Sequence, residues 1–211
     1  FGGIMFNLFT ELNNAGCPFF FEDMKQGNRE NLREKAGNFL ELFTVLSVGF
    51  VLLASEVYRY VYVSRDFWGS TMLIPIFVSS YYTNFLCTFP VNFEYYHKKT
   101  KVVSIITIVS SLINVGLNYL LILRIGMAGA AVATLISHSL QLTLHYLYVR
   151  FALGGKEYPF PLKMWVGYAA VFAAVAVASV AADGLWLARW GLGAAVGLWE
   201  LLRIRKRKVL I

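Results

Sequence analysis

The sequence predicts an all-α polytopic membrane protein, and three observations carry this prediction. The chain of 211 residues is 58% hydrophobic and only 15% charged, with a positive mean hydropathy of +0.59, whereas soluble domains are about 25% charged. Apolar runs long enough to cross a bilayer recur along the chain. The lysines and arginines gather in the gaps between these runs, as expected for cytoplasmic loops.

About six complete transmembrane helices are expected, preceded by a partial one. Residues 1–21 are apolar but contain Glu11, Asn13 and Asn14, and they resemble the end of a span whose start lies in a missing front portion. Residues 22–37 are highly charged with helical spacing, which predicts a short amphipathic surface helix as a connector. The complete spans are expected at 39–63, 69–93, 102–123, 127–153, 165–182 and 185–202.

The gaps between spans alternate in positive charge, which independently supports this count. One set holds four, three, three and five lysines or arginines, at 22–37, 94–101, 150–164 and 203–208. The alternate set holds one, one and none, at 64–68, 124–126 and 183–184. By the positive-inside rule the basic set, including the carboxyl-terminal tail, lies in the cytoplasm. The net charge of +7 therefore indicates membrane orientation and not nucleic-acid binding.

The span at 127–153 carries four polar side chains on one face. Thr134, His138, Gln141 and His145 are spaced by four, three and four residues, which places them in line on a helix. Polar groups at membrane depth are costly when they face lipid. They therefore either bond to neighbouring helices or line a polar cavity. His138 is the better protonation candidate of the two histidines, because His145 lies nearer the cytoplasmic end.

Other polar residues within the spans are candidates for the same two roles. Glu56 and Arg59 are three residues apart in the outer half of their span, and an interfacial pair or a cavity position fits both. Glu41, near the cytoplasmic end of the same span, is expected to be solvated. The amides that could lock helices together or line a path are Asn84, Asn114 and Asn118.

The sequence contains none of the motifs that identify common enzyme classes. It lacks HExxH, CxxC and GxSxG, and it lacks a glycine-rich phosphate loop followed by Lys-Ser/Thr. Cys17 and Cys87 are far apart, so neither a metal site nor a disulfide is expected. We therefore expect a protein that is not an enzyme and has no catalytic residue, resident cofactor or metal.

Small residues follow a pair of asparagines around the turn at 124–126. Asn114 and Asn118 precede the turn, and Gly126, Gly129-Ala130-Ala131, Ala133 and Thr134 open the next span. Small residues let membrane helices approach closely, so a tight helix–turn–helix is predicted. This pattern resembles the N-x3-N…G-x-x-G-A-A-x-A-T signature of polysaccharide exporters in the multidrug/oligosaccharidyl-lipid/polysaccharide (MOP) superfamily. The resemblance covers about residues 100–150 and is strongest to O-antigen and capsule flippases.

The resemblance implies a MATE-like transporter of two lobes, of which this chain would be the C-terminal half. Residues 1–153 would form the lobe and residues 154–211 the final two-helix pair. The implied function is export of a polyprenyl-pyrophosphate-linked oligosaccharide across the bacterial cytoplasmic membrane by alternating access, for surface polysaccharide such as lipopolysaccharide O-antigen or capsule. The coupling ion would be H+ or Na+. The implied partners are this lipid-linked oligosaccharide, the lipid bilayer and a polysaccharide polymerase, without nucleic acid.

Four other functions remain open at this point. A cation-coupled multidrug exporter and a lipid II flippase share the superfamily fold. A membrane-bound glycosyltransferase or acyltransferase would act on similar lipids, but it requires acidic or histidine side chains in a long outer loop, and the outer loops here are short. A scaffold without transport activity would not need polar residues on buried faces.

Overall fold

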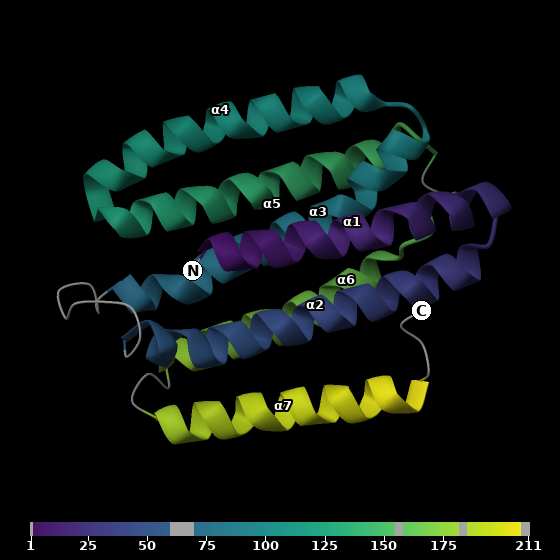
Figure 1. Ribbon diagram of the computed structural model, residues 1–211. Helices are drawn as coiled ribbons and strands as arrows, with labels where there is room; N and C mark the ends of the chain where they lie inside the picture. Colours follow the sequence, from purple (N-terminus) through teal and green to yellow (C-terminus); the bar gives the residue numbers. More distant parts are fainter. Residues whose placement is uncertain (1, 60–69, 155–157, 182–184, 208–211) are drawn as a thin grey trace.

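A computed structural model of the chain describes residues 2–59, 70–154, 158–181 and 185–207. These residues form seven α-helices and no strand (Figure 1). The helices are α1 (Gly2–Gln26), α2 (Arg29–Val57), α3 (Ile74–Tyr96), α4 (Thr100–Ile125), α5 (Met127–Phe151), α6 (Leu162–Ala181) and α7 (Trp186–Arg207).

Five of these helical segments are long and apolar enough to cross a membrane. They span Arg29–Val57, Ser70–Tyr96, Thr100–Ile125, Met127–Phe151 and Leu162–Ala181. The prediction of an all-helical, membrane-embedded protein is confirmed at this level. Neither α1 nor α7 meets the same criterion, so the count of six complete spans stays a prediction.

The predicted surface helix at 22–37 is not a separate element. Its first residues end α1, and its last residues begin α2, which continues without a break to Val57. The turn between them uses Gly27 at a φ of 71°, a conformation that glycine adopts without strain. Asn28 then accepts a hydrogen bond from the backbone N–H of Asn31 at 3.3 Å and caps α2. The charged residues after this cap therefore form the first turns of α2.

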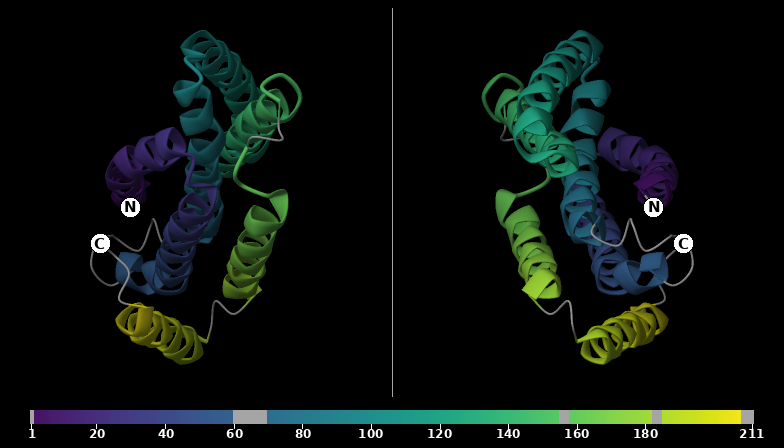
Figure 2. Two further views of the ribbon diagram at one scale, coloured as in Figure 1. Left: turned by 90° about the vertical axis from the view of Figure 1, so that its right-hand side faces the viewer. Right: turned by 90° about the vertical axis from the view of Figure 1, so that its left-hand side faces the viewer.

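Helices α2 and α3 form the centre of the bundle. Helices α1, α5 and α6 pack against α3, and α4 packs on the outer side of α5 (Figures 1 and 2). Stacked rings join three helices at the core: Phe43 of α2 lies 4.1 Å from Phe85 of α3, and Tyr82 of α3 lies 4.5 Å from Phe172 of α6. Such aromatic contacts add specific geometry to apolar burial.

The last two helices both pack against α2. Helix α6 also contacts α3, and Gly193 brings α7 close to the side chain of Leu53 on α2. The proposed boundary after residue 153 falls in the connection between α5 and α6. The division of the chain into a lobe and a final pair stays a prediction, because both helices join the same bundle.

The hairpin of α4 and α5 is as tight as its small residues predict. Gly126 turns the chain at a φ of 61°. Gly129 packs so closely on α4 that a Cβ there would overlap the backbone carbonyl of Leu121. The amide of Asn114 donates to the hydroxyl of Ser137 at 3.2 Å and ties the two helices together farther along. The asparagine-and-glycine pattern therefore builds a close helix pair.

We expect Gly129→Ala to destabilise the protein by roughly 1–3 kcal/mol, because backbone atoms must shift to admit the methyl group. Gly116→Ala is the matched control, since nothing lies within 4 Å of a Cβ at that position. The free energy of unfolding in detergent micelles measures both effects. Equal stability of the two variants would contradict the close packing at Gly129.

Candidate functional site

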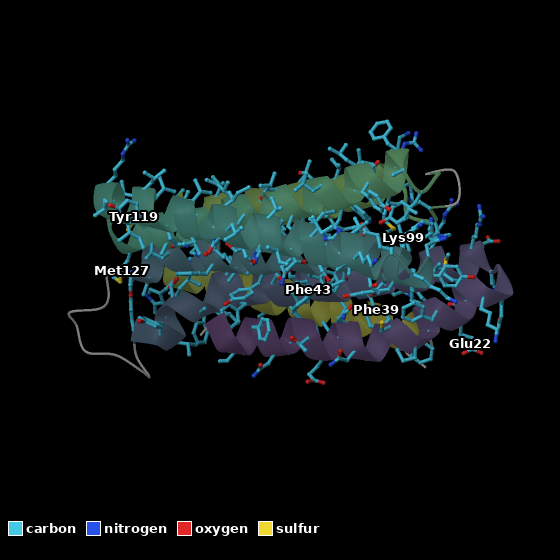
Figure 3. The ribbon with its side chains drawn as sticks, turned by 90° about the horizontal axis from the view of Figure 1, so that it is seen from above. Glu22, Phe39, Phe43, Lys99, Tyr119 and Met127 are labelled. Atoms are coloured by element: carbon cyan, nitrogen blue, oxygen red, sulfur yellow. The ribbon has the colours of Figure 1, made fainter. Side chains whose placement is uncertain are left out.

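Helix α1 runs alongside α3, which is long and apolar enough to cross a membrane. Glu22 and Lys99 mark the basic end of the bundle, and Tyr119 and Met127 mark the opposite end (Figure 3). Contacts between α1 and α3 begin at the opposite end and continue toward the basic end. They pair Phe6 with Tyr81 (6.4 Å between rings), Phe9 with Phe85 (6.3 Å between rings), and Asn13 with Asn92 (3.4 Å between side-chain atoms).

The exposed side of α1 carries three polar side chains among apolar ones such as Ile4 and Leu8. Asn7, Glu11 and Asn14 are spaced by four and three residues, so they share one helical face. All three side chains are exposed, and within the described chain none has a hydrogen-bond partner. Figure 2 shows α1 at the margin of the bundle, and Figure 3 shows side chains of α1 projecting away from it. We call these three residues the α1 polar stripe.

The polar stripe cannot face hydrocarbon without a large free-energy penalty. An ionised carboxylate at the centre of a membrane helix costs about 2.5–3.5 kcal/mol on insertion scales. By contrast, the exposed side chains of α4 are mostly aliphatic, as at Leu112 and Val115, which suits lipid contact. The α1 polar stripe therefore belongs against water or another polar surface, whereas the exposed Ile4 and Leu8 beside it suit apolar contact.

A groove between α1, α2 and α3 lies beside this stripe toward the basic end. Aromatic rings form its walls, and amide and hydroxyl groups interrupt them. Cys17 and Asn92 contact across it, with the sulfur 3.7 Å from the amide oxygen. The groove is lined by Leu12, Asn13, Gly16, Phe19, Phe20, Asp23, Leu32, Lys35, Ala36, Phe39, Phe85, Thr88, Phe89, Asn92 and Phe160.

An ion pair closes the basic end of the groove. The ammonium of Lys35 lies 2.9 Å from the carboxylate of Asp23 and 5.4 Å from the ring centre of Phe19. Asn31 donates a second hydrogen bond to Asp23 at 2.9 Å. Asp23 is buried, whereas Lys35 remains partly exposed. The groove thus combines aromatic walls, amides and an accessible ammonium, which suit an amphiphile with sugar or phosphate groups.

The predicted polar face of α5 bonds to neighbouring helices. The Nδ1 of His138 lies 2.9 Å from the carbonyl oxygen of Ser80 on α3, so this nitrogen carries a proton. Gln141 donates to Thr107 of α4 at 3.4 Å, and Thr134 donates to the backbone of its own helix. The structure therefore places these side chains in contacts between and within helices.

His145 forms a fully buried pair with Glu94. Its Nδ1 lies 2.9 and 3.0 Å from the two carboxylate oxygens, and both side chains are 0% exposed. The sequence did not single out Glu94, because it falls in the basic gap at 94–101. The sequence offers one indication of this pair, because both residues are expected at the cytoplasmic end of the membrane. In the structure this pair joins α3 to α5.

A second buried ion pair lies at the opposite end. Glu56 accepts from Arg189 of α7 at 3.0 Å, and both side chains are about 4% exposed. Arg59, which was expected to pair with Glu56, donates to Thr71 at 3.2 Å. Arg189 was missed because a single arginine in the apolar run at 185–202 was not considered as a partner.

One expectation about an acidic residue is wrong, and three about amides can now be placed. Glu41 is buried rather than solvated, because the helix continues past it and neighbours cover that face.

Asn118 donates to the carbonyl and amide oxygens of Asn114, both at 2.9 Å, so the two support the α4–α5 hairpin. Asn84 is half-buried on α3, with no hydrogen bond from its side chain among the described residues.

Metal binding has no support in the described part of the chain, which contains no group of three or more potential metal ligands. Comparisons with protein-family models, with curated proteins and with solved structures find no match to this chain. The function must therefore be argued from the site itself.

We expect Arg189→Met to lower the free energy of unfolding by about 3–5 kcal/mol, because it leaves the Glu56 carboxylate buried without its cation. The double variant Glu56→Gln with Arg189→Met removes both charges and should recover much of that loss. Denaturation in detergent micelles measures both. The pair would have no role in stability if Arg189→Met unfolded like the unmodified protein.

Proposed function

We propose that this protein is a flippase that exports a polyprenyl-pyrophosphate-linked oligosaccharide across the bacterial cytoplasmic membrane by alternating access. The α1 polar stripe is the observation that carries the proposal. It holds a carboxylate and two amides at membrane depth, exposed and without partners among the described residues. Such a stripe fits one wall of an aqueous path for a hydrophilic cargo.

The groove beside the stripe supports the choice of substrate class. A lipid-linked oligosaccharide has an apolar tail, a diphosphate and several sugar rings. Aromatic side chains such as Phe19 and Phe39 can contact the tail or stack on sugars, and the amides of Asn13 and Asn92 can bond sugar hydroxyls. The ammonium of Lys35 can contact a phosphate oxygen.

The α4–α5 hairpin supports the family assignment on which the substrate proposal also depends. Its signature residues act as scaffold, since Gly129 permits the close helix contact and Asn114 reinforces it. In the proposed arrangement α1 to α5 belong to one lobe of a MATE-like transporter and α6 and α7 form the final pair, with the basic end in the cytoplasm. The polar stripe would then face the second lobe across the substrate path.

Cysteine accessibility tests whether the stripe faces water. We expect Asn14→Cys, in a background with Cys17 and Cys87 replaced, to react readily with a membrane-impermeant, charged thiol reagent in intact membranes. Val115→Cys on α4 is the matched control, because Val115 is 67% exposed but lies on an apolar face. It should stay unmodified. Protection of both cysteines would place α1 against lipid and remove the main support for a transport path.

A genetic test addresses the function itself. Cells lacking the gene should lose surface polysaccharide and accumulate lipid-linked oligosaccharide in the inner leaflet. The unmodified gene should restore export, Glu11→Ala should restore it poorly, and Glu34→Ala should restore it fully. Glu34 is the control because it is an exposed carboxylate at the basic end of the bundle. Normal surface polysaccharide in the deletion strain, with no second flippase present, would overturn the proposed function.

A further inference from the structure

The buried Glu94–His145 pair is the contact that closes the basic end between α3 and α5. Its two heteroatom distances of 2.9 and 3.0 Å show that the imidazole Nδ1 faces both carboxylate oxygens. Neither side chain is exposed. A carboxylate and an imidazole inside a membrane helix bundle are expensive unless their charges cancel, because no water solvates them.

Charge balance sets the number of protons that the closed pair holds. With one shared proton the pair is neutral, whether that proton resides on His145 or on Glu94. Loss of the proton leaves a buried negative charge, and gain of a second leaves a buried positive charge. Either change leaves an uncompensated net charge between α3 and α5, which raises the free energy of the closed, buried arrangement.

The groups around the pair have incomplete hydrogen bonding. Tyr158, from the connection between α5 and α6, packs its ring 5.2 Å from Phe93 and 5.9 Å from Trp165. The Tyr158 hydroxyl, the Trp165 Nε1 and the His145 Nε2 are buried without partners in the described part of the chain. Burial raises the pKa of the Tyr158 hydroxyl well above its ordinary value, so this group stays neutral. Water that enters the region around the pair would supply hydrogen-bond partners to these three polar atoms.

The other titratable groups near the pair lie on α3, on α5 and in the turn after α3, where Lys98 and Lys99 follow and the Lys99 backbone N–H donates to the carbonyl oxygen of Glu94 at 2.9 Å. Cys87 is a buried thiol on α3. Tyr146 lies one residue after His145 on α5, with its ring 5.6 Å from that of Trp165. His97, at the end of α3, stacks on Phe93 at 4.5 Å. The two lysines are exposed, whereas Glu94 and His145 are fully buried, so the proton count of the pair sets the net charge inside the bundle at this point.

We propose that Glu94 and His145 form a proton-binding site that latches the basic end of the bundle. With one proton bound the latch is closed. When water reaches the pair, the proton leaves to bulk water or a second one arrives from it, with no other bond made or broken. The resulting net charge favours the open, hydrated arrangement of α3 and α5. Its role in driving export rests on the proposed function, but proton binding does not.

Nitrogen NMR on ¹⁵N-histidine protein in nanodiscs tests the proton count without any substrate. The His145 signal is assigned by its loss in His145→Gln, and His138→Gln should leave it unchanged. At neutral pH we expect a proton on Nε2, because both one-proton forms of the pair carry one there. An unprotonated Nε2 with the proton on Nδ1 would mean that the pair holds no shared proton, and this outcome would overturn the proposal.

Spin labels test the latch. Tyr95 and Leu147 are exposed positions next to the two partners, so labels on Tyr95→Cys and Leu147→Cys report the spacing of α3 and α5. We expect this spacing to increase over the pH range in which Nε2 changes its protonation. In the Glu94→Gln variant the spacing should not follow pH. A constant spacing while Nε2 titrates in the unmodified protein would overturn the latch.

Transport separates this proposal from the proposed function. In membrane vesicles we expect a pH gradient to accelerate glycolipid export by the unmodified protein, and Glu94→Gln to abolish this acceleration while exchange without a gradient persists. Glu94→Asp should restore part of it. Export that is equally accelerated in Glu94→Gln would overturn coupling at this site. Absence of export with a normal NMR result would instead contradict the proposed function alone.

Discussion

In the hydrocarbon core of a bilayer, water offers no hydrogen bonds, so each polar group there needs a partner within the protein or contact with an aqueous space. The described helices meet this constraint mainly by pairing across helix interfaces. Glu56 binds Arg189, His145 binds Glu94, and His138 donates to a carbonyl oxygen of α3. These contacts join α2 to α7 and α3 to α5, and the aromatic core fills the space between them.

The same constraint applies to the polar residues that have no partner in the described helices. Exposed side chains on α4 are mostly aliphatic and can contact lipid directly. The polar side chains of Asn7, Glu11 and Asn14 on α1 cannot contact lipid without a free-energy cost. Both helices lie at the margin of the bundle, so exposure alone does not distinguish them (Figure 2). Chemistry does, because α1 carries three polar side chains among its exposed apolar ones, whereas the exposed side chains of α4 are mostly aliphatic.

Different parts of the bundle provide stability and allow movement. Gly129 and Asn114 hold α4 and α5 in a close hairpin that has one packing solution. The Glu94–His145 contact depends on a single proton, so its strength can change while the hairpin stays intact. Helix α5 also packs along α3, where His138 bonds to Ser80, so the titratable contact is one of several that join the hairpin to the bundle.

Hydropathy and charge spacing, which act locally, determined the apolar helices, the tight turn at Gly126 and the alignment of polar residues on α5. The tertiary structure decided which of these residues meet. Glu94 and His145 are 51 positions apart, and Glu56 and Arg189 are 133 apart. Such pairs depend on helix neighbours and on the rotation of each helix about its axis, neither of which a local pattern encodes. The burial of Glu41 and the exposure of Glu11 have the same origin, since similar carboxylates in apolar segments receive opposite environments from the helices packed around them.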